Sequence, residues 1–263
     1  MCNSHDQTRR AFITSVLGSI LATGFRCSFA KEAAAGGGCV LSEAEFESSI
    51  TLADEALLRS IKNFNVASTP IFNRSGNSEF DQAFGRQLRQ MANTFGFRPG
   101  FGYYQDGSSP NAVATPFRRF PNTDGTVAFG LQLLDMCLKT RGGEVTALTI
   151  AAHEWGHIMQ FNQGYRQRIT QRFPAYCMEL HADYLAGFYL SEYRSKNPRA
   201  NLQLVGSTWS QMGSGRFNDP GSHGTNQQRV DAIEGGFRYR KRNPSASPRD
   251  AAEVGLSFVS KLI

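Results

Sequence analysis

The residues of this chain best suited to catalysis lie in the run His153-Glu154-Trp155-Gly156-His157. Side chains four residues apart lie one above the other on a helix, so the two imidazoles can bind one metal ion. Glu154 lies slightly around the same helix, where its carboxylate can accept a proton from water at the metal during attack on a carbonyl. The spacing therefore indicates metal-assisted hydrolysis.

The residues around this run predict a buried helix. Residues 145–152 are mostly apolar, and Gly164 provides a helix stop shortly after the second histidine. The same five-residue pattern also arises by chance on exposed helices. On a buried helix, however, paired histidines need a partner for their ring nitrogens, which favours the metal site.

A tetrahedral zinc site needs a third protein ligand, and residues 179–183 offer two. Pro174 suits the first turn of a helix on which Glu179 and Asp183 share one face. His181 lies roughly 200° around that helix from Glu179, so only one of them can face the metal. We expect Glu179 to be the ligand, because Asp183 on its face can accept a hydrogen bond from a ligand imidazole. His181 is then a packed or surface histidine.

These motifs resemble the gluzincin metallopeptidases, which pair a His-Glu-x-x-His helix with a later Glu-x-x-x-Asp helix. The runs 152–157, 179–187 and 223–230 look like the bacterial neutral zinc metallopeptidase family. The runs 111–116 and 125–134 look like the substrate-edge region of the CAAX-prenyl-protease and HtpX-type peptidase domain. His181 stands where the neutral zinc group more often has Gln, and Ile158 where it often has a further His.

The resemblance implies one Zn²⁺ per chain, bound by His153, His157 and Glu179, with Glu154 as general base and then general acid. It also places His223 near the metal, where it would stabilise the oxyanion that develops in the transition state.

Six residues after that histidine, Arg229 would orient the site through a charge-assisted hydrogen bond to Asp183 or Glu179. From the residues alone, His223 and Arg229 could equally be a helix cap and a surface arginine.

Residues 42–263 predict a single α+β metallopeptidase domain, mainly helical, with a small sheet beside the metal helix. Helices are expected from Ser42 to about Phe64 and from Glu79 to Phe95. Short strands are expected at 101–105, 111–115 and 126–129.

An exposed edge of this sheet could bind an extended peptide as an additional strand above the zinc. The alternative is a purely structural hairpin. The resemblance favours a substrate edge at Ala112 to Ala114 or at Thr126 to Ala128, which names Ala112, Ala114 and Val127 as substrate-edge residues.

Residues 1–30 have the features of a twin-arginine signal peptide. Arg9 and Arg10 precede an apolar run at 13–25 that is too short to span a bilayer, and Ser28-Phe29-Ala30 ends in small residues. The alternative is a buried amino-terminal helix with a chance arginine pair. Residues 31–41 read as a flexible linker. We therefore expect export to the periplasm or the exterior of a bacterial cell.

Three cysteines, Cys39, Cys137 and Cys177, remain after the predicted cleavage. In an oxidising compartment one pair could close and one thiol would remain. The sequence leaves the connectivity open. Cys177 lies off the face of Glu179 and is expected to be a structural thiol.

Charge and hydropathy limit the kinds of partner that this protein is expected to bind. Loss of Arg9, Arg10, Arg26 and Asp6 with the signal would lower the formal net charge from +6 to +4. The basic run 238–242 has no accompanying nucleic-acid-binding motif, so we expect no nucleic-acid partner. No stretch beyond the signal approaches the roughly 18 apolar residues of a membrane span.

The leading interpretation is an exported zinc metalloendopeptidase that acts on polypeptides or peptides. Two alternatives stay open: an exported zinc-binding or chaperone-like module without useful turnover, and a cell-wall peptide amidase. A pure binding module has no need for Glu154, whereas an amidase shares the chemistry and differs in its substrate pocket.

Overall fold

The computed structural model describes residues 65, 68–108, 110–200, 202 and 224–262. The expected signal peptide at 1–30, the linker at 31–41, the helix from Ser42 to Phe64, Cys39 and His223 lie outside these residues. The elements are α4 (Ser78–Phe95), β1 (Gly100–Tyr104), β2 (Ala112–Thr115), β3 (Thr126–Gly130), α5 (Leu131–Leu138), α6 (Gly143–Asn162), α7 (Tyr165–Thr170), α8 (Tyr176–Lys196), α11 (Asn226–Arg242) and α12 (Pro248–Val259).

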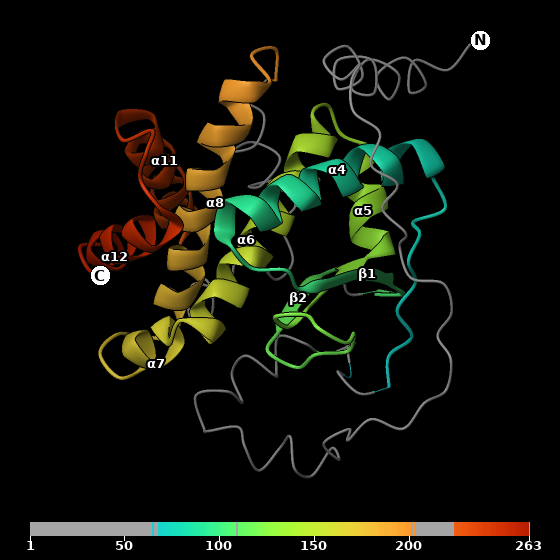
Figure 1. The fold of residues 1–263 in the computed structure, drawn as a ribbon, viewed down its shortest axis with the longest axis horizontal. Coiled ribbons are helices and arrows are strands. Elements are labelled where there is room, and N and C mark those ends of the chain that lie inside the picture. Colours follow the sequence, from blue (N-terminus) through green and yellow to red (C-terminus); the bar gives the residue numbers. More distant parts are fainter. Residues whose placement is uncertain (1–64, 66–67, 109, 201, 203–223, 263) are drawn as a thin grey trace.

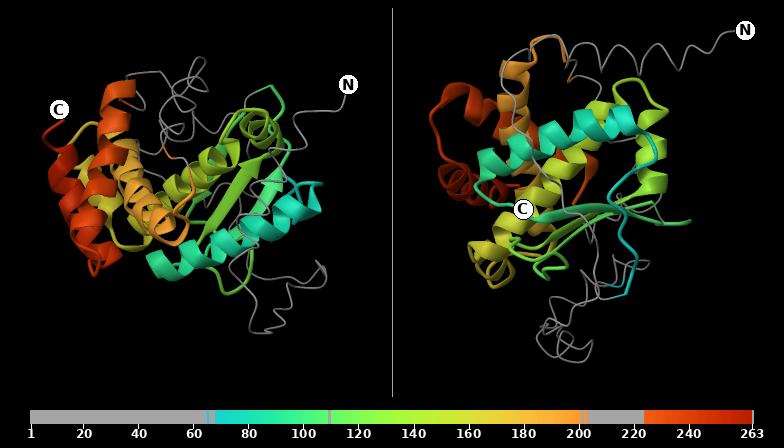
Figure 2. Two further views of the ribbon diagram at one scale, coloured as in Figure 1. Left: turned by 90° about the horizontal axis from the view of Figure 1, so that it is seen from above. Right: turned by 45° about the vertical axis from the view of Figure 1, so that its right-hand side comes forward.

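The described part is mixed helical with a small three-stranded sheet, as expected of an α+β fold. Figure 1 shows the sheet, α6, α8 and the pair α11–α12 following one another across the molecule, and Figure 2 shows the same succession from two other directions. Contacts between neighbours in this series, β2 with α6, α6 with α8 and α8 with α11 and α12, connect them. α8 is thus enclosed between helices on both sides.

Local sequence signals explain where the helices begin and end. The Asn77 side chain caps α4 by accepting a hydrogen bond from the Phe80 N–H, and Gly96 ends it in the left-handed conformation at φ 75°. α11 begins with a capping box in which the side chains and backbones of Thr225 and Gln228 bond to each other. The expected helix from Glu79 to Phe95 is therefore confirmed to within one residue.

The helices α6 and α8 are buried on nearly every face. In α6 every residue from Gly143 to Gln160 is buried, including the polar residues of the predicted metal helix. A helix that is enclosed on all faces belongs to the core rather than to an amphipathic surface layer. The polar side chains of both helices must therefore find partners inside the protein.

The three expected strands are present, and their order corrects one prediction. β1 and β3 pair in parallel, β2 and β3 pair antiparallel, and the order is β1-β3-β2. Val127 lies on the central strand, where both sides of the backbone are already used by β1 and β2. Its prediction as a substrate-edge residue is wrong, because the order of strands depends on pairing between segments distant in the chain.

Two glycines allow the helices α8 and α11 to pack closely against each other. A Cβ at Gly236 of α11 would overlap the Tyr184 carbonyl oxygen of α8, and a Cβ at Gly187 of α8 would overlap the Ile233 carbonyl oxygen of α11. Each helix thus uses a glycine where the backbone of the other approaches it. No side chain of any size fits between them without separating the helices.

None of the helices in the described ranges combines the length and apolar character that a membrane-crossing helix needs.

We predict that Gly236→Ala lowers the free energy of unfolding by about 1–3 kcal/mol, because the added methyl group forces α8 and α11 apart. Gly85→Ala on α4 is the matched control. Its Cβ would meet only an Arg89 guanidinium nitrogen at 3.9 Å, so the higher helix propensity of Ala should leave stability equal or raise it by up to about 1 kcal/mol. Urea unfolding followed by circular dichroism measures both. A Gly236→Ala protein as stable as wild type would contradict the close approach.

Candidate metal centre

Three buried side chains from two helices bring their donor atoms together. The Nε2 atoms of His153 and His157 on α6 are 3.0 Å apart. The Glu179 carboxylate on α8 lies 3.3 Å from Nε2 of His153 and 3.4 Å from Nε2 of His157. These donors lie within 4.8 Å of one another, and each of the three residues is 5–8% exposed. The cluster could bind a metal ion.

The other ring nitrogens fix the tautomers of both histidines. Nδ1 of His153 is 2.8 Å from Oδ1 of Asp183, an acceptor, and Nδ1 of His157 is 2.8 Å from Oε1 of Gln160. Both Nδ1 atoms must therefore carry hydrogen, which leaves a lone pair on each Nε2 of the neutral rings. Two lone pairs 3.0 Å apart repel each other unless a cation lies between them. The contacts thus prepare the site for a proton or a metal ion.

The carboxylates around the cluster favour a proton on the His153 imidazole. Burial alone would lower the pKa of His153, but the carboxylates of Asp183 and Glu179 outweigh it and raise the pKa to about 10. A metal ion must displace this proton to bind, so its affinity falls as the pH falls.

A positively charged side chain from another helix binds the Asp183 carboxylate. Arg229 of α11 donates from Nε to Oδ2 of Asp183 at 2.7 Å and from a terminal nitrogen to Oδ1 at 3.0 Å. Burial would raise the pKa of Asp183, but Arg229 first and His153 second lower it below its ordinary value. Arg229 is 1% exposed, so the alternative of a surface arginine is wrong, and its expected hydrogen bond to Asp183 is present.

His157 is positioned by a chain of hydrogen bonds that the sequence analysis missed. Gln160 accepts from Nδ1 of His157 through Oε1, and its Nε2 donates to the Met178 carbonyl oxygen at 2.8 Å and to Nδ1 of His181 at 3.0 Å. Nε2 of His181 then donates to the Ala252 carbonyl oxygen at 2.9 Å. Gln160 lies three residues after His157 on the same helical face, which is the one signal that could have identified it.

His181 is therefore a packed histidine outside the donor cluster, one of the two roles expected for it. It is fully buried and tilted against Tyr165, with 5.4 Å between ring centroids. Glu179, the other candidate for the third ligand, faces the two imidazoles.

Glu154 lies beside the donors on α6 and is 7% exposed. Burial raises the pKa of its carboxyl group, an effect that the nearby imidazoles of His153 and His157 oppose. Burial, followed by the negative charges of Asp106 and Glu154, raises the pKa of Tyr104. The carboxylate is thus enclosed next to the three clustered donors, as the helix spacing predicts.

β2 is one edge strand of the sheet, on the side next to α6 (Figure 1). The Gly130 N–H donates to the Asn111 carbonyl oxygen at 2.9 Å, so the alternation of an antiparallel ladder directs the N–H and C=O groups of Ala112 and Ala114 away from β3. Within the described residues no further strand pairs with β2. Ala112 and Ala114 are therefore on an edge strand, and both residues are buried, at 8% and 7% exposed.

The remaining predicted residues take no part in the cluster. Cys137 and Cys177 are buried, and no disulfide joins them. Within the basic run at 238–242, Arg240 is half-buried and bonds to Glu192 and to the Ala246 carbonyl oxygen, while Arg238 pairs with Glu234.

Comparison with protein-family models, with curated proteins and with solved structures gives no match. The assignment of this site consequently depends on its own geometry.

We predict that Gln160→Leu weakens metal binding about 10- to 100-fold, because His157 loses the acceptor that fixes its tautomer and ring orientation. Competition with a chromophoric chelator measures the affinity, and thermal unfolding of the metal-free protein measures stability separately. Gln167→Leu, at an exposed position of α7, is the matched control and should bind as wild type does. Unchanged affinity in Gln160→Leu would remove Gln160 from the support of the site.

His181 predicts a pH dependence of stability. Burial lowers its pKa from 6.5 to about 4, since the folded protein has no room to solvate an imidazolium. Between these values the unfolded chain binds the extra proton, so the free energy of unfolding falls as the pH falls from about 7 to about 4, by about 3 kcal/mol.

His181→Gln, whose amide can still donate to the Ala252 carbonyl oxygen, should lose this contribution. Urea unfolding of both proteins between pH 7 and pH 4.5, with a chelator present, isolates it as a difference. The same pH dependence in both would contradict a neutral buried His181.

Proposed function

We propose that this protein is an exported zinc-dependent metalloendopeptidase that hydrolyses peptide bonds in polypeptides or peptides. The observation that carries the proposal is the convergence of two imidazole lone pairs and the Glu179 carboxylate beside the buried Glu154. Two nitrogens and one carboxylate are the ligands of zinc in one class of metallopeptidase and leave a fourth position open. We infer one zinc ion per chain.

The distances between the donors suit a zinc ion. Zinc–ligand bonds of about 2.0–2.1 Å in a tetrahedron place neighbouring donors about 3.3–3.4 Å apart. The measured separations are 3.0, 3.3 and 3.4 Å. Calcium and magnesium prefer oxygen ligands and higher coordination numbers, so this nitrogen-rich group does not suit them.

Zinc in such a ligand set supplies Lewis acidity to a peptide carbonyl and to water. Glu154 supplies the proton transfers: its carboxylate accepts a proton from the attacking water and then delivers it to the leaving amine nitrogen. The same proton is used in both steps, so the residue returns to its ionised form. Burial raises the pKa of Glu154, which makes its carboxylate a better base.

The edge of β2 that no described strand pairs with would hold the substrate in an extended conformation. The outward N–H and C=O groups of Ala112 and Ala114 can form main-chain hydrogen bonds with a peptide, without regard to its side chains. This edge lies on the α6 side of the sheet, so a bound peptide would run beside the metal helix.

Asp183 and Arg229 keep His153 oriented throughout the reaction, and we assign transition-state stabilisation to His223. The resemblance to gluzincin metallopeptidases, with features of the neutral zinc family and of the CAAX-prenyl-protease/HtpX-type domain, supports these roles. Export by the twin-arginine route rests on residues 1–30. Both inferences come from the sequence.

We predict that Glu154→Gln lowers turnover about 10²- to 10⁴-fold while about one zinc per chain remains, because the side chain transfers protons and does not ligate the metal. A proteome-derived peptide library, incubated with and without a chelator, measures cleavage, and elemental analysis measures zinc. Glu234→Gln, on the surface of α11, is the matched control and should cleave as wild type does.

The outcomes separate the proposal from its alternatives. Normal cleavage by Glu154→Gln would contradict the mechanism. A wild-type protein that binds zinc but cleaves nothing in the library would favour the zinc-binding module, and cleavage restricted to cell-wall peptides would favour the amidase.

A further inference from the structure

A series of hydrogen bonds connects the carboxyl-terminal helix α12 to one histidine of the donor cluster. Oε1 of Gln160 on α6 lies 2.8 Å from Nδ1 of His157, and Nε2 of Gln160 lies 3.0 Å from Nδ1 of His181 on α8. Nε2 of His181 lies 2.9 Å from the Ala252 carbonyl oxygen of α12. Gln160 and His181 are both 0% exposed. Water therefore does not compete for these groups.

The direction of each bond in this hydrogen-bond series follows from its α12 end. A carbonyl oxygen only accepts, so Nε2 of His181 must carry the hydrogen that faces Ala252. An amide nitrogen only donates, so Nδ1 of His181 must present a lone pair to Gln160. The Gln160 oxygen is then left to accept from Nδ1–H of His157, whose remaining lone pair lies on Nε2. Each donor and acceptor thus has one possible assignment.

The Gln160 amide needs His181 in addition to the Met178 carbonyl. Its nitrogen carries two hydrogens, and one of them bonds to the Met178 oxygen at 2.8 Å. Without His181 the second hydrogen would have no acceptor in a region closed to water, which is unfavourable. Gln160 could find another acceptor only by turning away from His157. The lone pair on Nδ1 of His181 therefore keeps the amide in place.

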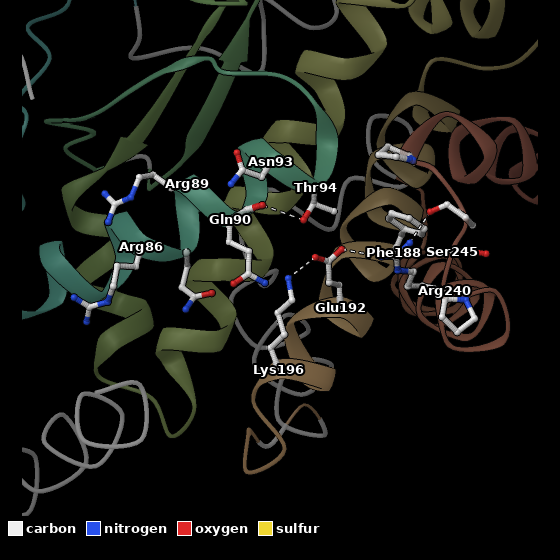
Figure 3. Close-up of a pocket in the computed structure, with 14 residues that line it drawn as sticks. Arg86, Arg89, Gln90, Asn93, Thr94, Phe188, Glu192, Lys196, Arg240 and Ser245 are labelled. Carbon is white, nitrogen blue, oxygen red and sulfur yellow. Dashed lines mark hydrogen bonds and ion pairs between the residues drawn. The ribbon is translucent and has the colours of Figure 1, made fainter. Parts of the chain in front are cut away.

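Bonds to two other helices fix the position of α12 around Ala252. On the α8 side, Arg240 bonds to Glu192 and to a carbonyl oxygen in the turn that precedes α12 (Figure 3). On the α7 side, Glu253 accepts from the Tyr165 hydroxyl at 2.8 Å and from both terminal nitrogens of an arginine at 2.7 and 2.9 Å. The carbonyl group that determines the direction of the series is therefore held on both sides.

We infer that His181 is a positioning residue of the metal centre, which acts through Gln160 to hold the Nε2 lone pair of His157 toward the donor cluster. In this role His181 touches neither metal nor substrate. The Ala252 carbonyl makes α12 the support of one imidazole, as α11 supports the other through Asp183. The inference concerns the proposed metal site, so its test includes one measurement on metal-free protein.

The first measurement uses full-length, metal-free wild-type protein. Heteronuclear NMR of the imidazole nitrogens shows which ring nitrogen carries hydrogen. We expect His181 to carry hydrogen on Nε2 and none on Nδ1, and His157 to carry a slowly exchanging hydrogen on Nδ1. The opposite tautomer at His181, or an imidazolium there at neutral pH, would contradict the inference without any substitution.

Two substitutions at His181 then separate hydrogen bonding from packing. His181→Met removes both the donor and the acceptor, so Nδ1–H of His157 should exchange with solvent at least about tenfold faster. His181→Gln can accept from Gln160 through its oxygen and donate to the Ala252 carbonyl through its nitrogen. It should restore slow exchange. Failure of His181→Gln to do so would show that the shape of the ring matters and its hydrogen bonds do not.

Zinc affinity, measured by competition with a chromophoric chelator, gives a second readout. His181→Met should bind zinc about 3- to 10-fold more weakly than wild type, and His181→Gln should stay within about twofold. Val259→Ala is the matched control, because this side chain of α12 is 0% exposed and lies outside the hydrogen-bond series. It should unfold at a lower urea concentration and yet bind zinc within about twofold of wild type.

The outcomes also separate this inference from the proposed function. Wild-type zinc affinity and wild-type exchange in His181→Met would overturn positioning by His181. An equal loss of affinity in Val259→Ala would assign the effect to the packing of α12. Absence of zinc binding in the wild-type protein would refute the proposed function, while the tautomers and exchange rates of the metal-free protein would still decide the role of His181.

Discussion

The carboxylate of Asp183 has no access to water, and the protein must neutralise it from within. It does so from two sides, with the bidentate guanidinium of Arg229 and with the imidazole of His153. Removal of the guanidinium would leave the buried charge with only the His153 imidazole as a partner, which costs several kcal/mol or is relieved by protonation. A protonated Asp183 would no longer accept from His153 in the same way, and the Nε2 lone pair of His153 would no longer be held toward His157 and Glu179.

This requirement explains why α11 packs so closely on α8. An arginine can reach a fully buried carboxylate only if the helix that carries it lies close by, and Gly187 and Gly236 permit that approach. The capping box at Thr225 starts α11 four residues before the arginine, which fixes where Arg229 emerges. Local sequence signals, helix packing and the electrostatics of the site are thus parts of one arrangement.

Much of the site could be predicted from the sequence because it depends on helical spacing alone. The intervals His153 to His157 and Glu179 to Asp183 determine which side chains share a face, and helical geometry does not change with context. Gln160 was missed because Gln has no chemical signature of its own, and its role depends on the Met178 carbonyl and His181 brought from another helix.

The position of Val127 was misjudged for a related reason. A short apolar segment predicts a strand but not its neighbours, since both edges and centres of small buried sheets have similar composition. The burial of Arg229 was equally invisible, because one arginine in a polar segment usually lies at the surface. Residue spacing in the sequence could not predict the properties that depend on contacts between distant segments of the chain.

The two buried cysteines can report on local unfolding of the protein. Burial raises the pKa of the Cys137 thiol to about 12 and that of Cys177 to about 11, so neither forms an appreciable thiolate at neutral pH while the fold is closed. Cys137 lies in α5, next to the sheet, and Cys177 lies in the first turn of α8. A thiol reagent can therefore reach each only when its own part of the molecule separates, and the two labelling rates would reveal whether the sheet and the helical layers open as one cooperative unit or in succession.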